Sequence, residues 1–169
     1  MSAEHKPSIH FVDDVLHVDS VPVPEIVAAV GSPVYIYSKQ HFQHQYQQLE
    51  TALAEFSGHI CYAVKANSNL AVLSIFEALG AGFDIVSGGE LQRVLATGAQ
   101  PGRVVFSGVG KSTADIDSAL KLEIGCFNVE SAQELDRLAQ RAELLGKTAP
   151  VALRVNPDVD PKTHPYIST

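Results

Sequence analysis

The 169-residue sequence has only two cysteines, no cluster of basic residues and no long apolar run. A membrane-spanning helix needs roughly 18 or more apolar residues, and the opening "MSAEHKPSIH" lacks the apolar core of a secretion signal. Cys61 and Cys126 lie far apart in apolar runs, so they form neither a CxxC motif nor a metal-ligand spacing. We therefore expect a cytoplasmic protein in a reducing compartment, with no membrane partner.

Positive charge is in the minority, with 12 Lys and Arg against 19 Asp and Glu and a net charge of -7. Without a basic run, the charge argues against nucleic acid or an anionic membrane as the main partner and favours a small soluble ligand. A composition of 46% hydrophobic and 18% charged residues predicts a globular chain that forms one compact unit or part of one.

Short apolar runs alternate with amphipathic stretches through most of the chain. This alternation repeats at a spacing of roughly 20 to 25 residues. It predicts βα units that form a parallel sheet, either doubly wound or closed as a (β/α) barrel. Spacings typical of capping boxes at Ser87 and Ser131, and a related one at Ser112, predict helix starts. Glycines predict where helices stop. The predicted strands begin near Ile60, Phe83, Val104, Cys126 and Val151, and the helix stops are Gly80, Gly98 and Gly146.

The first 38 residues differ from the repeats. We expect residues 1–38 to contribute short strands, including "SPVYIYS", and one short helix to a second, β-rich domain. Residues 39–169 are expected to begin with a long helix and to form the first part of the barrel. A complete (β/α)8 barrel needs roughly 250 residues, and the sequence closes on the loop-like "NPDVDPKTHPYIST". We therefore expect an α/β chain that holds a partial (β/α)8 TIM-type barrel and is the front part of a longer protein.

A lysine stands at the end of the first predicted barrel strand, "HICYAVKAN". Strand alternation places Lys65 with Cys61 and Ala63 on a small-residue face, which we expect to point into the barrel near its C-terminal mouth. Burial of an ammonium group is costly unless a carboxylate pairs with it or its pKa falls. On position alone, a buried ion pair and a Schiff-base lysine remain equally acceptable interpretations.

Several ordered motifs carry a family resemblance over nearly the whole chain. The sequence resembles the alanine-racemase-like, fold type III pyridoxal-phosphate decarboxylases, and within them the diaminopimelate decarboxylases. The resemblance implies pyridoxal 5'-phosphate as cofactor, held as an internal aldimine by Lys65. The motifs are "GSPVYIYS", "YAVKAN", "GFDIVSGGEL", "VVFSGVGKS", "LRVNPDVDP" and "HPYIST".

The resemblance also implies roles for four further residues. Asp84 would lie beside the cofactor and pair with Lys65, although an ordinary ion pair inside the barrel is an equal alternative. Glu90 matches an acid near the cofactor, but it is also the third helical residue after Ser87, and we favour the capping role. Arg154 would lie near the cofactor, and a pairing with Asp84 or Glu90 is compatible with that. His164, in a loop on the functional side of the barrel, is a further candidate cofactor contact.

The resemblance implies decarboxylation of meso-2,6-diaminopimelate to L-lysine, the last step of lysine biosynthesis, by a homodimer. The family's phosphate-binding glycine loop, the carboxylate facing the pyridine nitrogen, the stacking histidine and the partner subunit's cysteine and acid are not among these residues. We therefore expect a chain that truly ended at Thr169 to be inactive. The alternatives are another fold type III decarboxylase or racemase acting on a basic amino acid, and a non-catalytic cofactor-binding fragment.

The segment "SGVGKST" is close to a nucleotide-binding P-loop but does not match it. The P-loop pattern needs glycine at position 105, where the chain has Val105. Nucleotide binding is therefore not expected. We predict instead that Ser112 caps a helix and that Lys111 is exposed to solvent.

Overall fold

A three-stranded antiparallel sheet opens the computed structural model, which describes residues 7–157, 159 and 162. Its strands are β1 (Ile9–Val12), β2 (Val15–Val18) and β3 (Val21–Pro22), followed by helix α1 (Val23–Val30). Asp13 and Asp14, between β1 and β2, both have positive φ, as a two-residue type I′ hairpin turn requires. The predicted short helix of this region and the short strands before it are confirmed.

The rest of the described chain forms a five-stranded parallel sheet whose strands follow one another in sequence order. Helix α2 (Lys39–Ala52) leads into the sheet, and the short 3-10 turns η1 (Val64–Ala66) and η2 (Pro101–Arg103) interrupt the loops. The strands are β4 (Cys61–Ala63), β5 (Gly82–Ile85), β6 (Val104–Phe106), β7 (Cys126–Val129) and β8 (Val151–Leu153), and the intervening helices are α3 (Leu70–Ala78), α4 (Gly88–Leu95), α5 (Thr113–Leu122) and α6 (Ala132–Leu145).

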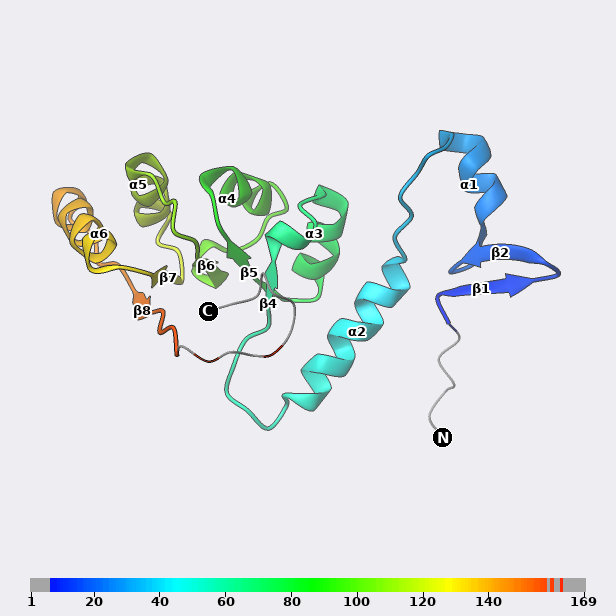
Figure 1. Cartoon of the computed structure of the whole chain (residues 1–169), viewed down its shortest axis with the longest axis horizontal. Coiled ribbons are helices and arrows are strands. Elements are labelled where there is room, and N and C mark those ends of the chain that lie inside the picture. Colours follow the sequence, from blue (N-terminus) through cyan, green and yellow to red (C-terminus); the bar gives the residue numbers. More distant parts are fainter. Residues whose placement is uncertain (1–6, 158, 160–161, 163–169) are drawn as a thin grey trace.

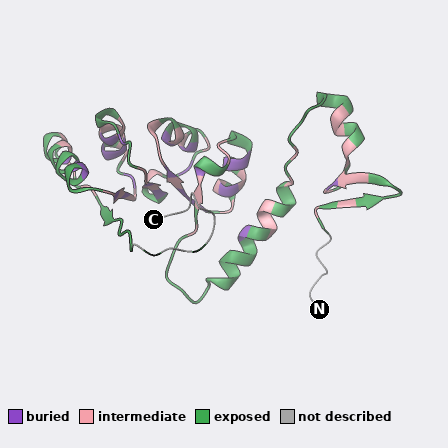
Figure 2. Cartoon of the chain, viewed as in Figure 1, coloured by how far each residue is buried: buried purple, intermediate pink, exposed green. Residues whose placement is uncertain are grey.

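Helices α3 to α6 all cover the same face of this sheet (Figure 1). A doubly wound sheet carries helices on both faces and reverses its strand order, so sequential strands with helices on one face identify a partial (β/α) barrel. The core lies between the sheet and these helices, while the N-terminal hairpin is mostly exposed or intermediate (Figure 2). The largest fully buried side chains of the core include Phe83, Phe106, Phe127, Leu73, Ile85, Leu91 and Ile116.

The local signals read from the sequence fix the helix boundaries. Ser112 and Asp115 form a complete capping box at the start of α5, which confirms Ser112 as an N-cap. The Ser87 and Ser131 hydroxyl groups cap α4 and α6 by accepting hydrogen bonds from the backbone N–H groups three residues later. Positive φ values of 81°, 88° and 60° follow α3, α4 and α6, at the three glycines predicted as helix stops.

The prediction of a strand in "SPVYIYS" is wrong. Residues 32–38 run without strand pairing from the cis Ser32–Pro33 bond to Ser38, which caps α2. Tyr35 is 89% exposed, so the alternation of its neighbours does not bury one face. Strand propensity reflects packing against partner strands, and the described chain supplies none here. None of the helices in this described part is long and apolar enough to cross a membrane.

Gly88, at the start of α4, lies against the neighbouring helix. A Cβ built on Gly88 would be 2.1 Å from Asp115 Oδ1, and the Asp115 carboxylate is held by the backbone N–H and hydroxyl of Ser112. We expect Gly88→Ala to lower the free energy of unfolding by about 1–3 kcal/mol, because the capping box must shift. Urea unfolding measures this, and Gly89→Ala is the control, because its nearest neighbour would be 3.8 Å away. Equal stability of the two variants would contradict the predicted clash.

Candidate functional site

Lys65 lies at the carboxyl end of β4, as expected, but it is not buried. The strand ends at Ala63, and Lys65 is the middle residue of the 3-10 turn η1. Tyr62 stacks on Phe76 of α3 with ring centroids 4.1 Å apart, so it faces the helices. The lysine side chain is exposed and makes no hydrogen bond or ion pair with another residue of the described chain. Burial was wrongly predicted because Lys65 lies with exposed Cys61 on the face of the sheet that the helices leave uncovered, while Val64 on the opposite face is buried.

Asp84 begins a chain of polar contacts along the uncovered face of the sheet. Its carboxylate accepts a short hydrogen bond from the Ser107 hydroxyl, and Ser107 Oγ accepts one from Asn128 Nδ2 at 3.0 Å. Asp84 belongs to β5, Ser107 directly follows β6 and Asn128 belongs to β7. The expected partner Lys65 makes no such contact with Asp84 in the described chain, so three neighbouring strands present one hydrogen-bonded polar row instead.

The carboxylate of Asp84 also acts on a thiol of the same face. Cys61 has a raised pKa, first because its sulfur is partly desolvated and next because of the Asp84 charge. A raised pKa keeps the thiol protonated near neutral pH. Cys61 is therefore a neutral neighbour of the site and not a reactive thiolate.

Arg154 pairs with a carboxylate that the sequence analysis did not select. Arg154 Nη1 donates to Glu130 Oε2 at 3.0 Å, and Glu130 Oε1 accepts from the Gly108 backbone N–H at 2.9 Å. The proposed partners Asp84 and Glu90 were wrong, because Glu130 follows β7, the strand adjacent to β8. A sequence signal that could have found Asn128 and Glu130 is their position as polar side chains at the carboxyl end of a buried strand.

Glu90 has the favoured capping role at the start of α4. Its backbone N–H donates to Ser87 Oγ at 3.2 Å, and its carboxylate accepts from the Val86 backbone N–H at 2.7 Å. A capping box would place that second bond on Ser87, so the chain uses the preceding residue instead. The same variant recurs at α6, where the Glu134 carboxylate accepts from the Glu130 N–H. His164 lies outside the described residues.

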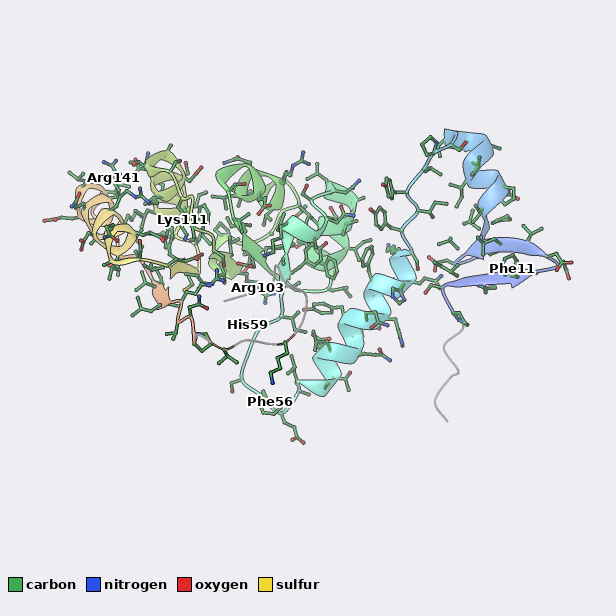
Figure 3. All side chains as sticks on the ribbon, viewed as in Figure 1. Phe11, Phe56, His59, Arg103, Lys111 and Arg141 are labelled. Atoms are coloured by element: carbon green, nitrogen blue, oxygen red, sulfur yellow. The ribbon has the colours of Figure 1, made fainter. Side chains whose placement is uncertain are left out.

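Lys111 is buried, so the prediction that it is exposed to solvent was wrong. It is only 2% exposed, and its ammonium group contacts Glu134 Oε1 at 2.6 Å. Figure 3 labels it on the side of the molecule where α5 and α6 lie. An internal pair of this kind leaves the lysine unable to reach a nucleotide phosphate, in agreement with the imperfect P-loop pattern.

Comparisons with known proteins agree with this arrangement of strands. Residues 39–169 match the model of the family described as "Pyridoxal-dependent decarboxylase, pyridoxal binding domain". The chain is 55% identical over 157 residues to a diaminopimelate decarboxylase of Pseudomonas aeruginosa, covering 93% of this chain and 38% of the relative. A diaminopimelate decarboxylase of Neisseria meningitidis is 54% identical over 154 residues, again with 38% of its length covered.

A solved structure gives the same result. The diaminopimelate decarboxylase of Helicobacter pylori, complexed with L-lysine, superposes with a TM-score of 0.83 at 45% identity and covers 86% of this chain and 37% of that one. The chain thus spans about 38% of the length of the curated relatives it matches. With 131 of its residues matched, the chain belongs to the pyridoxal-dependent decarboxylases.

Proposed function

We propose that the protein to which this chain belongs is a diaminopimelate decarboxylase, which converts meso-2,6-diaminopimelate to L-lysine. The carboxylate at the D-configured centre leaves as carbon dioxide, and a proton takes its place. Two relatives above 50% identity bear this name, and a related structure holds L-lysine. The observation that carries the proposal is the placement of Lys65, Asp84 and Arg154 at the carboxyl ends of strands of one parallel sheet, the end where active sites of this fold lie.

The residues at this edge fit pyridoxal phosphate. An exposed lysine amine can reach an aldehyde, and the small side chains of Cys61 and Ala63 leave room over the uncovered face of β4. The Asp84, Ser107 and Asn128 row offers hydrogen-bonding groups to a polar aromatic ring. When bound, the cofactor supplies a ring that accepts the electron pair released as carbon dioxide leaves.

Each site residue has a distinct proposed task. Lys65 would hold the cofactor covalently, and its release by the substrate amine would free it to recapture the cofactor after reaction. Asp84, oriented by Ser107, and Arg154, oriented by Glu130, would place opposite charges at the rim. Glu90 serves the start of α4 and would contact the cofactor only from there. His164 is retained as a candidate contact.

The wider organisation is also part of the proposal. We infer that residues 1–38 belong to a second, β-rich domain and residues 39–169 to the barrel, because β1–β3 form their own antiparallel sheet. The active protein would be a cytoplasmic homodimer that acts on a small amino acid and binds neither nucleic acid nor membrane. The net charge of -7 supports the absence of polyanionic partners.

Carbon dioxide release by the full-length protein tests the proposed reaction. With pyridoxal phosphate present, we expect release from meso-diaminopimelate and little or none from L-ornithine, L-arginine or L-lysine. A preference for one of those three would assign a different decarboxylase of the same fold. No release from any substrate by a cofactor-loaded protein would favour a non-catalytic role and contradict the proposal.

A further inference from the structure

The buried ammonium group of Lys111 is fully occupied by three acceptors. It donates to the Gly108 carbonyl at 2.7 Å, to the Asn128 carbonyl at 2.8 Å and to Glu134 Oε1 at 2.6 Å. A lysine has three N–H donors, so none remains for solvent or ligand. The ammonium nitrogen also lies 5.6 Å from the ring centroid of Phe106. Lys111 therefore joins the loop after β6, the end of β7 and the first turn of α6.

Two chains of hydrogen bonds, one leading to Asp84 and the other to Arg154, start from the groups that Lys111 binds. Asn128, whose carbonyl it binds, donates from its side chain to Ser107 and so reaches Asp84. Gly108, whose carbonyl it also binds, donates its N–H to Glu130, the partner of Arg154. Glu134 connects Lys111 to the second chain as well, because its other carboxylate oxygen accepts from the Glu130 N–H at 3.1 Å.

Stability alone does not require a charged pair at this place. Buried ion pairs are often replaced by apolar residues of similar volume without loss of stability, because desolvation offsets their attraction. What an apolar side chain cannot do is donate hydrogen bonds that hold two carbonyl groups at fixed positions. Two of the short contacts of Lys111 do so for Gly108, in the loop after β6, and Asn128, in β7.

We propose that Lys111 is a positioning residue that fixes the carboxyl ends of β6 and β7, so that Asp84 and Arg154 are held where the cofactor binds. The inference rests on the proposed function for its ligand. Lys111 touches neither Asp84 nor Arg154 and acts only through Asn128, Ser107, Gly108 and Glu130.

The test uses the double variant Lys111→Met/Glu134→Gln in the full-length protein. It removes both buried charges, and the glutamine keeps an oxygen that can accept from the Glu130 N–H. Its thermal stability is expected to fall less than that of Lys111→Met alone, because no buried charge is left unpaired, while its affinity for pyridoxal phosphate, titrated by visible absorption, falls roughly tenfold or more. Removal of groups that orient metal ligands costs about 10- to 100-fold in affinity, and we expect a loss of the same scale for a residue that orients cofactor contacts. The matched control is Glu123→Gln/Lys147→Met, which removes an exposed pair also 2.6 Å long and is expected to leave affinity unchanged.

Amide hydrogen exchange of the cofactor-free protein supplies a second readout. In Lys111→Met/Glu134→Gln, faster exchange at residues 108 and 130 is expected, because both amides bond within the network. Unchanged exchange together with unchanged cofactor affinity would overturn the positioning role. Should the unmodified protein bind no pyridoxal phosphate, the proposed function fails, and the exchange measurement still decides whether Lys111 orders these two strand ends.

Discussion

Replacement of Lys65 by alanine is expected to abolish covalent attachment of pyridoxal phosphate and to lower carbon dioxide release by about a thousandfold or more. Stability should change little, within about 0.5 kcal/mol, because the side chain is exposed and makes no hydrogen bond or ion pair with other residues of the described chain. This separation of function from stability is what distinguishes a cofactor lysine from a structural one.

Visible absorption and turnover of the full-length Lys65→Ala variant give the result directly. Lys121→Ala is a suitable control, because Lys121 is an exposed lysine of α5. The control is expected to keep both the absorption of lysine-bound cofactor and full activity. If Lys65→Ala kept the same absorption band, another group would be holding the cofactor and the assignment of Lys65 would be wrong.

Replacement of Lys111 alone by methionine is expected to destabilise the full-length protein by about 3–5 kcal/mol. The single substitution leaves the Glu134 carboxylate, which is only 5% exposed, without its cation, and an uncompensated buried charge is costly. It also leaves the Gly108 and Asn128 carbonyls without a donor. Urea unfolding at neutral pH measures the loss.

The exposed pair formed by Lys147 and Glu123 is the matched comparison. Lys147→Met breaks an ion pair of the same length at the surface, and its cost should stay below about 1 kcal/mol. Similar losses for Lys111→Met and Lys147→Met would mean that Lys111 is hydrated in solution. That outcome would agree with the prediction from the sequence that Lys111 is exposed to solvent, and it would remove the basis for a positioning role.

The repeated units of this fold could be predicted because their signals are local. Strand starts follow from apolar runs such as that at Phe83, and helix limits follow from capping residues such as Ser112 and from glycines such as Gly80. Local signals gave a wrong prediction at "SPVYIYS". Its side chains alternate as in a strand, but no partner strand pairs with it among the described residues. Strands need neighbours, and a single segment does not reveal them.

The sequence indicated single residues of the candidate site but not the contacts between them. Lys65 stood out because charge is unusual at a strand end, and Asp84 was implied by the resemblance, but the contacts that build the site join distant residues. Asp84 bonds Ser107, which is 23 residues further along the chain, and Lys111 is buried only because Glu134, also 23 residues away, folds onto it. Adjacent strands of a parallel sheet are separated by a whole crossover, so such pairs carry no short-range sequence signal.

The most direct test of the account locates the cofactor on the chain. The full-length protein is loaded with pyridoxal phosphate, reduced with borohydride so that the lysine-bound cofactor becomes a stable adduct, and digested for mass spectrometry. We predict one modified peptide, carrying the adduct on Lys65 and containing the sequence "VKANSN". An adduct on another lysine, or an unmodified Lys65 in protein that decarboxylates diaminopimelate, would contradict the central claim.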